Sequence, residues 1–367
     1  MLYGSRLTAP RGLSGGAQRT KGMPRMSKES RQWVLKSRPP GLVGPEHFEL
    51  KTTTVADPGD GEILVKTLYL SFDPTQRGWL NEGPGYMDPL KIGAPMFGAG
   101  LGQVVKSNDP AFKEGDVVNG MIPWQDYAIL KNGAGLMPLQ PVSRDYPLTW
   151  AFSVFGITTL TAYFGLQEVG QVKEGDVVLI SGAAGATGSA VAEIAKIRGA
   201  SKVIGVAGGP EKCRWVVEEG ACDAAIDYKS DDLEAKLREL APNGVNVFYD
   251  NTGGPILNAA LANLAQGARI AICGGISSGY SSWTMPEGPN NYLFLVLKSA
   301  RMEGFLLFNY AAKFPQAIAD IGTWVKEGKL KVHESVSEGL EKAPAVLQGL
   351  FTGQNKGKAI LKVADPV

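Results

Sequence analysis

The sequence predicts an α/β protein in which a domain of short strands, close to a small β-barrel, is joined to a doubly wound parallel sheet. Three observations predict this fold class. The length of 367 residues suits about two domains. Apolar residues make up 44% of the chain and charged residues 20%, which is typical of a globular and not a disordered protein. Short strand and turn patterns fill residues 33–142, whereas strand and helix patterns alternate after Pro147.

Charge and residue counts exclude several classes of function. The 37 Lys and Arg residues balance 36 Asp and Glu residues, so we expect no nucleic acid and no anionic membrane surface as a partner. The longest apolar runs, such as residues 305–308, are too short to span a membrane. Three scattered cysteines and two histidines leave almost no ligands for a zinc site and fit a reducing compartment.

The first 28 residues differ in composition from the rest of the chain. They contain six basic residues and no acidic one, and are otherwise rich in Gly, Ser and Thr. We interpret residues 1–28 as a disordered leader, a remnant of cloning, or the result of translation that truly starts at Met23 or Met26. The alternative is an organelle transit peptide, which has this arginine-rich composition. The chain is therefore expected to be cytoplasmic, or located in a mitochondrion or plastid if this segment is a transit peptide.

The first domain is expected to consist mainly of strands. Strand patterns bounded by Gly, Asp and Pro turn clusters predict four strands, at residues 61–70, 102–106, 115–118 and 126–130.

After Pro147, strands and helices are expected to alternate. Buried apolar strands are predicted at residues 176–181, 202–207, 224–227, 245–250, 268–273 and 302–308. Helices are predicted at residues 188–198, 210–219 and 231–240. Pro210 suits the first turn of the second helix and Asp231 the cap of the third. Residues 331–367 return to the strand pattern and are expected to rejoin the first domain.

A glycine-rich segment between the first strand of this series and its helix indicates dinucleotide binding. Gly182, Gly185 and Gly188 are spaced three residues apart. Small residues let the backbone approach a pyrophosphate, and a helix N-terminus offers free N–H groups. The spacing differs from the usual Gly-x-Gly-x-x-Gly, and a glycine-rich turn can serve packing alone. Its place in a strand–turn–helix unit favours the dinucleotide interpretation.

The end of the second strand predicts which dinucleotide binds. An NAD site has a carboxylate there, to hold the ribose diol. In this chain the strand ends in Ala207-Gly208-Gly209-Pro210, and the cations Lys212 and Arg214 follow. Cations attract a 2′-phosphate, so NADPH is the expected cofactor. The alternative for each cation is an exposed helix position.

Several segments in one order make this chain resemble the zinc-free branch of the medium-chain dehydrogenase/reductase family. Within it, the chain is most similar to the group of prostaglandin reductases, plant double-bond reductases and curcumin reductases. The resemblance covers residues 33–363. The segments that carry it are residues 33–35, 70–74, 185–189, 208–212, 250–254, 273–278, 301–305 and 355–358.

The resemblance implies a GroES-like β-barrel domain plus a Rossmann domain, in a homodimer. We expect residues 29–150 and 330–367 to form the substrate-binding and catalytic domain, and residues 151–329 the NADP-binding domain. The implied reaction is reduction of the C=C bond of α,β-unsaturated ketones and aldehydes, by hydride transfer from NADPH to the β-carbon. The alternatives are a quinone reductase of the same superfamily and a non-catalytic NADPH-binding protein.

The resemblance also implies roles for particular residues. The pyrophosphate would lie at Gly185, Ala186, Thr187, Gly188 and Ser189, and the 2′-phosphate at Lys212 and Tyr228. Asn251 would contact the centre of the cofactor. The nicotinamide and its ribose would be lined by Cys273, Gly274, Ile276, Ser277, Ser278, Gly279, Phe305, Leu306, Leu307 and Asn355. Packing or turn formation is the alternative for Tyr228, Asn251 and Cys273.

Tyr280 is the candidate proton donor. Relatives carry a tyrosine after an Ile-Ser pair, and here one extra residue separates that pair from Tyr280. The alternative is a loop tyrosine that only lines the pocket. Two departures bear on activity. Relatives have Tyr and Met where this chain has Thr75 and Gln76, and plant relatives have Tyr where it has Leu297.

An apolar cleft between the domains is the expected substrate pocket. Its candidate lining residues, for which ordinary packing is the alternative, are Trp79, Tyr86, Met87, Trp124, Tyr280 and Trp283.

Overall fold

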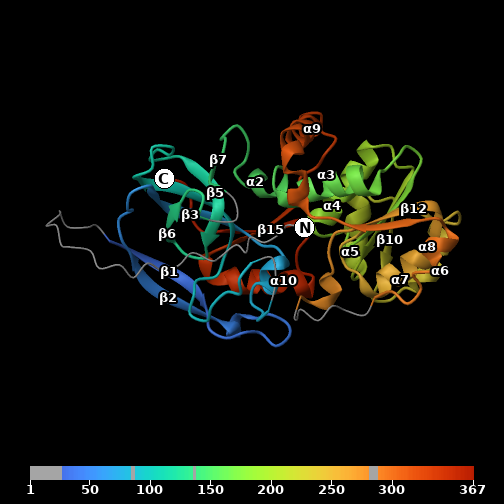
Figure 1. Cartoon of the computed structure of the whole chain (residues 1–367), viewed down its shortest axis with the longest axis horizontal. Coiled ribbons are helices and arrows are strands. Elements are labelled where there is room, and N and C mark those ends of the chain that lie inside the picture. Colours follow the sequence, from blue (N-terminus) through green and yellow to red (C-terminus); the bar gives the residue numbers. More distant parts are fainter. Residues whose placement is uncertain (1–26, 84–86, 135–137, 281–287) are drawn as a thin grey trace, which may run out of the picture.

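The computed structural model of the chain describes residues 27–83, 87–134, 138–280 and 288–367. The sheets divide the molecule in two, with most of the β1–β7 strands on one side and the parallel sheet and its helices on the other (Figure 1). The two-domain fold predicted from the sequence is thereby confirmed, with a sheet-rich first domain and a Rossmann-like second one.

The first domain is built around the long strand β3. β3 (Glu62–Ser71) pairs with β4 (Phe97–Ser107) along its length and with β6 (Tyr127–Lys131) at its start. β5 (Val117–Pro123) and β7 (Gln140–Pro141) extend the sheet beyond β4. A separate antiparallel pair, β1 (Lys28–Leu35) and β2 (Phe48–Val55), was not predicted. The short helix α1 (Thr75–Gly78) follows β3.

The four strands predicted here are all present, with shifted bounds. The third begins only at Val117 because Gly115, with a φ of +91°, lies in a tight turn.

The second domain has the strand order β10-β9-β8-β11-β12-β13, all parallel. This is a doubly wound order, in which strands are added outward in one direction from β8 and then in the other direction from β11, so the strand order reverses between these two neighbours. The strands are β8 (Val177–Ser181), β9 (Lys202–Ala207), β10 (Ala224–Asp227), β11 (Val245–Asp250), β12 (Leu264–Ile272) and β13 (Arg301–Gly304).

Helices cover this sheet. They are α3 (Ile157–Phe164), α4 (Ala186–Ile197), α5 (Pro210–Glu218), α6 (Leu233–Leu240), α7 (Gly254–Ala262), α8 (Phe294–Leu297) and α9 (Phe314–Lys326). The short helix α2 (Trp150–Ser153) precedes them, and its Phe152 packs against strands of the first domain. The cap of α6 is Asp232, whose carboxylate accepts a hydrogen bond from the Ala235 N–H at 3.0 Å. The prediction of Asp231 as the cap was wrong: Asp231 accepts instead from the Asp227 N–H.

The sixth strand is shorter than the predicted residues 302–308. Gly304 pairs with Ile272, the last residue of β12, so the chain has no neighbouring strand beyond that point. A 3-10 helix, Leu307–Lys313, follows and buries the Leu307 side chain.

The end of the chain rejoins the first domain, as predicted. β15 (Lys358–Lys362) pairs with β3 and with β14 (Glu334–Glu338). The purely strand-like pattern expected for residues 331–367 was wrong, because helix α10 (Ala343–Thr352) lies between the two strands. α10 and β15 lie near the middle of the molecule (Figure 1).

Candidate active site

The glycine-rich turn joins β8 to α4 and lies at the point where the strand order reverses. Gly182 has a φ of +61°, and α4 begins directly after Gly185. A Cβ on Gly188 would lie 2.3 Å from the Gly182 carbonyl oxygen. The backbone of the glycine-rich turn therefore packs directly against the backbone of α4. The first turn of α4 carries no acidic side chain. Its first N–H groups and its positive dipole end therefore suit an anionic group.

A buried carboxylate connects this turn to the end of β11. Asp250 is fully buried, and its Oδ1 accepts from Ser181 Oγ at 2.7 Å and from the N–H groups of Thr252 and Gly253 at 2.9 Å. Asn251 donates from its amide to the Ser181 carbonyl at 2.8 Å. These bonds hold the ends of β8 and β11 together, and they place Asn251 beside the glycine-rich turn.

The segment after β12 lies along the segment after β11. Cys273 donates its N–H to the Asp250 carbonyl at 2.8 Å, and Ile276 to the Asn251 carbonyl at 3.2 Å. Ser277 donates its N–H to the Thr252 carbonyl at 3.1 Å. Predicted residues Cys273 to Gly279 thus lie beside Asn251.

Tyr280 folds back onto this segment. Its φ is +49°, a conformation that residues other than glycine seldom adopt. Its hydroxyl oxygen accepts a hydrogen bond from the Gly275 N–H at 3.1 Å. Its carbonyl accepts one from the Asn81 amide of the first domain at 2.9 Å. The phenol is therefore held at the boundary between the two domains.

Lysine residues gather beside the end of β9. Lys212 on α5 is half-buried and has no ion pair or hydrogen bond within the described residues. Burial, and then the nearby Lys229 and Lys356 charges, lower the pKa of Lys212 from its ordinary value. The ring of Tyr228 covers Gly208, where a Cβ would lie 2.7 Å from Tyr228 Cε1. An unpaired, partly desolvated cation is a binding group for an anion.

The returning tail contacts both of these regions. Gly357 donates its N–H to the Ala184 carbonyl at 2.9 Å and forms an isolated bridge with Gly185. Asn355 lies two residues earlier and donates its amide to the Gly357 carbonyl at 2.9 Å. Lys356 pairs with Glu211 on α5 at 2.6 Å. The first domain therefore contributes side chains to the surroundings of the glycine-rich turn.

The remaining predicted residues lie mainly in packing positions. Phe305 packs edge-on against Tyr249 with ring centroids 6.3 Å apart. Leu307 is buried in the core of the second domain, whereas Leu306 is 51% exposed. The Cys273 thiol is enclosed, and burial raises its pKa to about 11, so it stays protonated and unreactive at neutral pH.

Two of the expected pocket residues have their side chains in packed positions. Trp124 is fully buried, and its ring packs against Phe48 and Phe72. The expectation that Trp124 lines a cleft was therefore wrong. Trp79 stacks on Phe97 with ring centroids 5.2 Å apart. Met87 is partly buried. Tyr86 and Trp283, like the leader predicted at the N-terminus up to residue 26, lie outside the described residues.

Of the three residues that depart from the relatives' pattern, Thr75 and Leu297 are exposed and Gln76 is buried in the first domain. Thr75 is exposed on α1, and Leu297 is 70% exposed at the end of α8. Gln76 is buried, and its amide donates to the Phe97 carbonyl at 3.2 Å.

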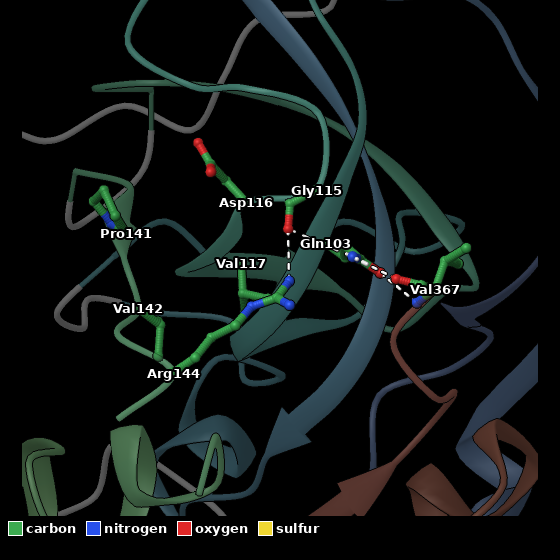
Figure 2. Close-up of a pocket in the computed structure, with 8 residues that line it drawn as sticks. All are labelled: Gln103, Gly115, Asp116, Val117, Pro141, Val142, Arg144 and Val367. Carbon is green, nitrogen blue, oxygen red and sulfur yellow. Dashed lines mark hydrogen bonds between the residues drawn. The ribbon is translucent and has the colours of Figure 1, made fainter. Parts of the chain in front are cut away.

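One cavity lies apart from the predicted site residues. It is formed by β4, β5 and the chain end, and Figure 2 shows Gln103 exchanging two hydrogen bonds with Val367 and Arg144 donating to the Gly115 carbonyl. The chain itself thus supplies partners to the polar groups drawn there.

Within the described residues no group of three His, Cys, Asp or Glu side chains is arranged to hold a metal ion, and Cys213, Cys222 and Cys273 are free thiols. None of the helices in the described ranges is both long and apolar enough to cross a membrane.

The residues present fit a dinucleotide that carries a 2′-phosphate. The contact of Gly188 with Gly182 leaves no room for a side chain at position 188. Without a side chain there, an anionic group such as a pyrophosphate can approach the backbone at the start of α4. The half-buried Lys212 is a cation of the kind that pairs with a phosphate, and no carboxylate follows β9 directly. Asp227, at the end of the next strand, is occupied by hydrogen bonds from the N–H groups of Gly209 and Lys229, which lower its pKa.

Sequence reasoning missed Asp250, Asn81 and Lys356 as members of this site. A carboxylate at the end of the buried apolar strand 245–250 was a usable signal for the first. The other two reach the site from the first domain and the tail, and nothing local in the sequence marks them.

Comparisons with known proteins agree with this geometry. Family models described as "N-terminal domain of oxidoreductase" and "Zinc-binding dehydrogenase" match residues 31–139 and 186–323. The NADPH-dependent curcumin reductase of Escherichia coli is 39% identical over 93% of this chain and 99% of its own length. The NADP⁺-dependent 2-alkenal reductase of Nicotiana tabacum is 36% identical over 91% of this chain and 98% of its own.

A solved structure agrees as well. CurA from Vibrio vulnificus in complex with NADPH is 36% identical, with a TM-score of 0.84 over 92% of this chain and 100% of that one. The family predicted from the sequence is confirmed. The chain belongs to the medium-chain dehydrogenase/reductase family, in the zinc-free group of its curcumin and alkenal reductase relatives.

Proposed function

We propose that this chain reduces the C=C bond of α,β-unsaturated ketones and aldehydes with NADPH. The observation that carries the proposal is the half-buried Lys212 after β9, the strand next to the one that leads into the glycine-rich turn, in a chain with relatives named NADPH-dependent curcumin reductase and NADP⁺-dependent 2-alkenal reductase. We assign residues 151–329 to the NADP-binding domain, and residues 29–150 and 330–367 to the catalytic domain. The composition of the two larger sheets supports this division.

The proposed cofactor-binding residues lie around the point where the strand order reverses, between β8 and β11. The start of α4, from Gly185 to Ser189, would hold the pyrophosphate, and Asn251 would face the centre of the cofactor. Lys212 and Tyr228 would hold the 2′-phosphate, with Lys356 and Lys229 adding positive charge. The nicotinamide end would lie along Cys273 to Gly279, with Phe305 to Leu307 and Asn355 nearby.

When bound, NADPH supplies a hydride to the β-carbon of the substrate. Negative charge then develops on the carbonyl oxygen, and the α-carbon needs a proton. Tyr280 would give its phenolic proton to the α-carbon and regain one from water. Its Oη accepts a hydrogen bond from the Gly275 N–H, which holds the phenol beside the segment proposed to line the nicotinamide.

The direct test is NADPH oxidation at 340 nm by the purified chain. The panel comprises a 2-alkenal, a long-chain enone, a phenyl-substituted enone and a quinone, each repeated with NADH. We expect turnover of at least one enone or enal with NADPH, and a saturated product that keeps its carbonyl group. Preference for the quinone would replace the proposal by a quinone reductase. NADPH binding without any turnover would indicate a non-catalytic binding protein.

We also propose that the chain forms a homodimer through the edge of the parallel sheet. Among the described residues β13 has a neighbouring strand on one side only, so its outer backbone groups can pair with a second copy. Apolar side chains beside this edge are 51–73% exposed, and they are Tyr292, Leu293, Val296, Leu297, Leu306 and Phe308. A patch of this kind favours association of two copies.

The double change Val296→Glu with Leu297→Glu is expected to shift the protein from dimer to monomer. It places two charges in the proposed interface, and burying an unpaired charge costs several kcal/mol. Size-exclusion chromatography with light scattering measures the result. Leu50→Glu, at an exposed apolar position of β2, is the control and should leave the mass unchanged. A monomeric wild-type protein, or a double variant that remains dimeric, would refute this interface.

We further propose that the protein is located in the cytoplasm. Free thiols and bacterial relatives that match over more than nine-tenths of this chain support it. Fractionation of cells that express the full chain, with and without residues 1–28, distinguishes it from an organelle.

A further inference from the structure

Asn81 lies where the two domains meet and contacts a residue 199 positions away in the sequence. It follows α1 in the first domain, and its Nδ2 donates to the Tyr280 carbonyl at 2.9 Å. Its Oδ1 accepts from Arg77 Nη1 at 2.6 Å. One amide therefore joins a buried cation of the first domain to the main chain of Tyr280.

Arg77 is held rigidly. Its side chain is fully buried, its Nε and Nη2 donate to the Gly41 carbonyl at 3.1 and 2.9 Å, and Nη2 also donates to the Pro39 carbonyl at 2.8 Å. Burial lowers the pKa of the guanidinium to about 10, so it stays charged at neutral pH.

The chemistry of Arg77 determines which way the Asn81 amide faces. A guanidinium has donors and no acceptor, so the amide must turn its oxygen toward Arg77. The NH₂ end then points to Tyr280 and donates to its carbonyl oxygen. An aspartate at position 81 would keep the contact with Arg77 and face the carbonyl with an acceptor.

The main chain at Tyr280 needs such support. Gly279 has a φ of +66° and Tyr280 a φ of +49°, so two consecutive residues are left-handed. A residue with a Cβ is disfavoured there and persists where surrounding contacts hold it. The Asn81 bond holds the carbonyl, and the Gly275 N–H holds the hydroxyl oxygen at the opposite end of the residue.

We infer that Asn81, oriented by Arg77, is a positioning residue that holds Tyr280 in place for proton transfer when the two domains are together. The inference rests on the proposed role of Tyr280 as proton donor. Asn81 itself touches neither substrate nor cofactor in this account. Its loss changes how often the phenol is correctly placed, and not the cofactor site.

Kinetics of four variants test this inference: Asn81→Ala, Asn81→Asp, Tyr280→Phe, and the double change Asn81→Ala with Tyr280→Phe. The substrate is the enone of the panel that turns over fastest, at saturating NADPH. We expect Asn81→Ala to lower kcat about tenfold, with NADPH affinity unchanged and a larger solvent deuterium isotope effect on kcat. A general acid contributes about 10²–10⁴-fold, so Tyr280→Phe should lower kcat further. The double variant should be no slower than Tyr280→Phe.

Asn81→Asp keeps the size of the side chain and its bond with Arg77, so it is the variant least affected by misfolding. It should lower kcat at least as much as Asn81→Ala. Asn108→Ala is the matched control, because Asn108 also donates its amide to a main-chain carbonyl of the first domain, that of Pro58 at 2.6 Å. We expect wild-type kinetics from it.

The outcomes distinguish a failure of the positioning role of Asn81 from a failure of the proposed proton-donor role of Tyr280. Loss of kcat in Tyr280→Phe with wild-type kcat in both Asn81 variants overturns the positioning role alone. Multiplying effects in the double variant, or an unchanged isotope effect in Asn81→Ala, also overturn it. Wild-type kcat in Tyr280→Phe overturns the proton-donor role, and the inference with it. Absence of any enone turnover by the wild-type protein refutes the proposed function itself.

Discussion

Replacement of Lys212 by glutamate is expected to raise KM for NADPH about 100-fold and to leave KM for NADH nearly unchanged. A hydrogen bond to a charged group is worth about 1.5–3 kcal/mol, and each 1.4 kcal/mol is tenfold in affinity. The reversed charge adds repulsion of the 2′-phosphate. Lys212 has no partner within the described residues, so the change breaks no ion pair of the folded chain. Initial rates with both cofactors measure the effect.

The same lysine makes NADPH binding sensitive to alkaline pH. Burial and neighbouring lysines lower the pKa of Lys212, so its positive charge is lost at a lower pH than that of an ordinary lysine. KM for NADPH should therefore rise with pH before KM for NADH does. The control is Lys236→Glu on α6, whose side chain is exposed and pairs with Glu239. Equal effects of Lys212→Glu on NADPH and NADH would contradict the assignment of Lys212 to the 2′-phosphate.

Local sequence patterns predict the second domain well. Each strand from β8 to β12 is a short apolar run, and β8, β9 and β11 are buried over most of their length. The apolar run at 302–308 predicts too long a strand, because its residues belong to two different elements. Met302 belongs to the edge strand, whereas Leu307 fills the core from a 3-10 helix after the strand has lost its neighbour. Periodicity alone does not separate a strand from the segment that follows it.

Contacts between the domains are what the sequence does not reveal. Asn81 and Tyr280 are 199 residues apart, and the tail reaches Gly185 through Gly357. Each of these pairs joins residues that are far apart in the sequence, so no local pattern marks either partner. Helix α10 was missed although Pro344 stands in its first turn and Gly353 ends it with a φ of +74°. The start and stop signals of a helix are thus present in the sequence, and the strand-like residues on either side of them hide the helix.

Replacement of Gly188 by alanine is expected both to destabilise the protein and to weaken NADPH binding at least tenfold. An alanine Cβ there would lie 2.3 Å from the Gly182 carbonyl oxygen and 2.8 Å from Ala183 Cα. Both are main-chain atoms, so the turn and the start of α4 must move apart. Overpacking of this kind costs about 1–3 kcal/mol. The same movement displaces the first N–H groups of α4, which are the groups proposed to face the pyrophosphate.

The control is a glycine in a helix where a methyl group has room. A Cβ on Gly322 of α9 would have its nearest contact at 3.8 Å, with Phe155 Cε1. Alanine is favoured over glycine in a helix interior by about 1 kcal/mol, so Gly322→Ala should raise the melting temperature. The two substitutions are chemically identical and their expected signs are opposite, because only Gly188 is pressed against another main chain. Thermal melts and fluorescence titration with NADPH measure both properties. If Gly188→Ala were as stable as Gly322→Ala and bound NADPH normally, Gly188 would be no more than an ordinary helix residue, and the proposed pyrophosphate site at the start of α4 would lose its structural basis.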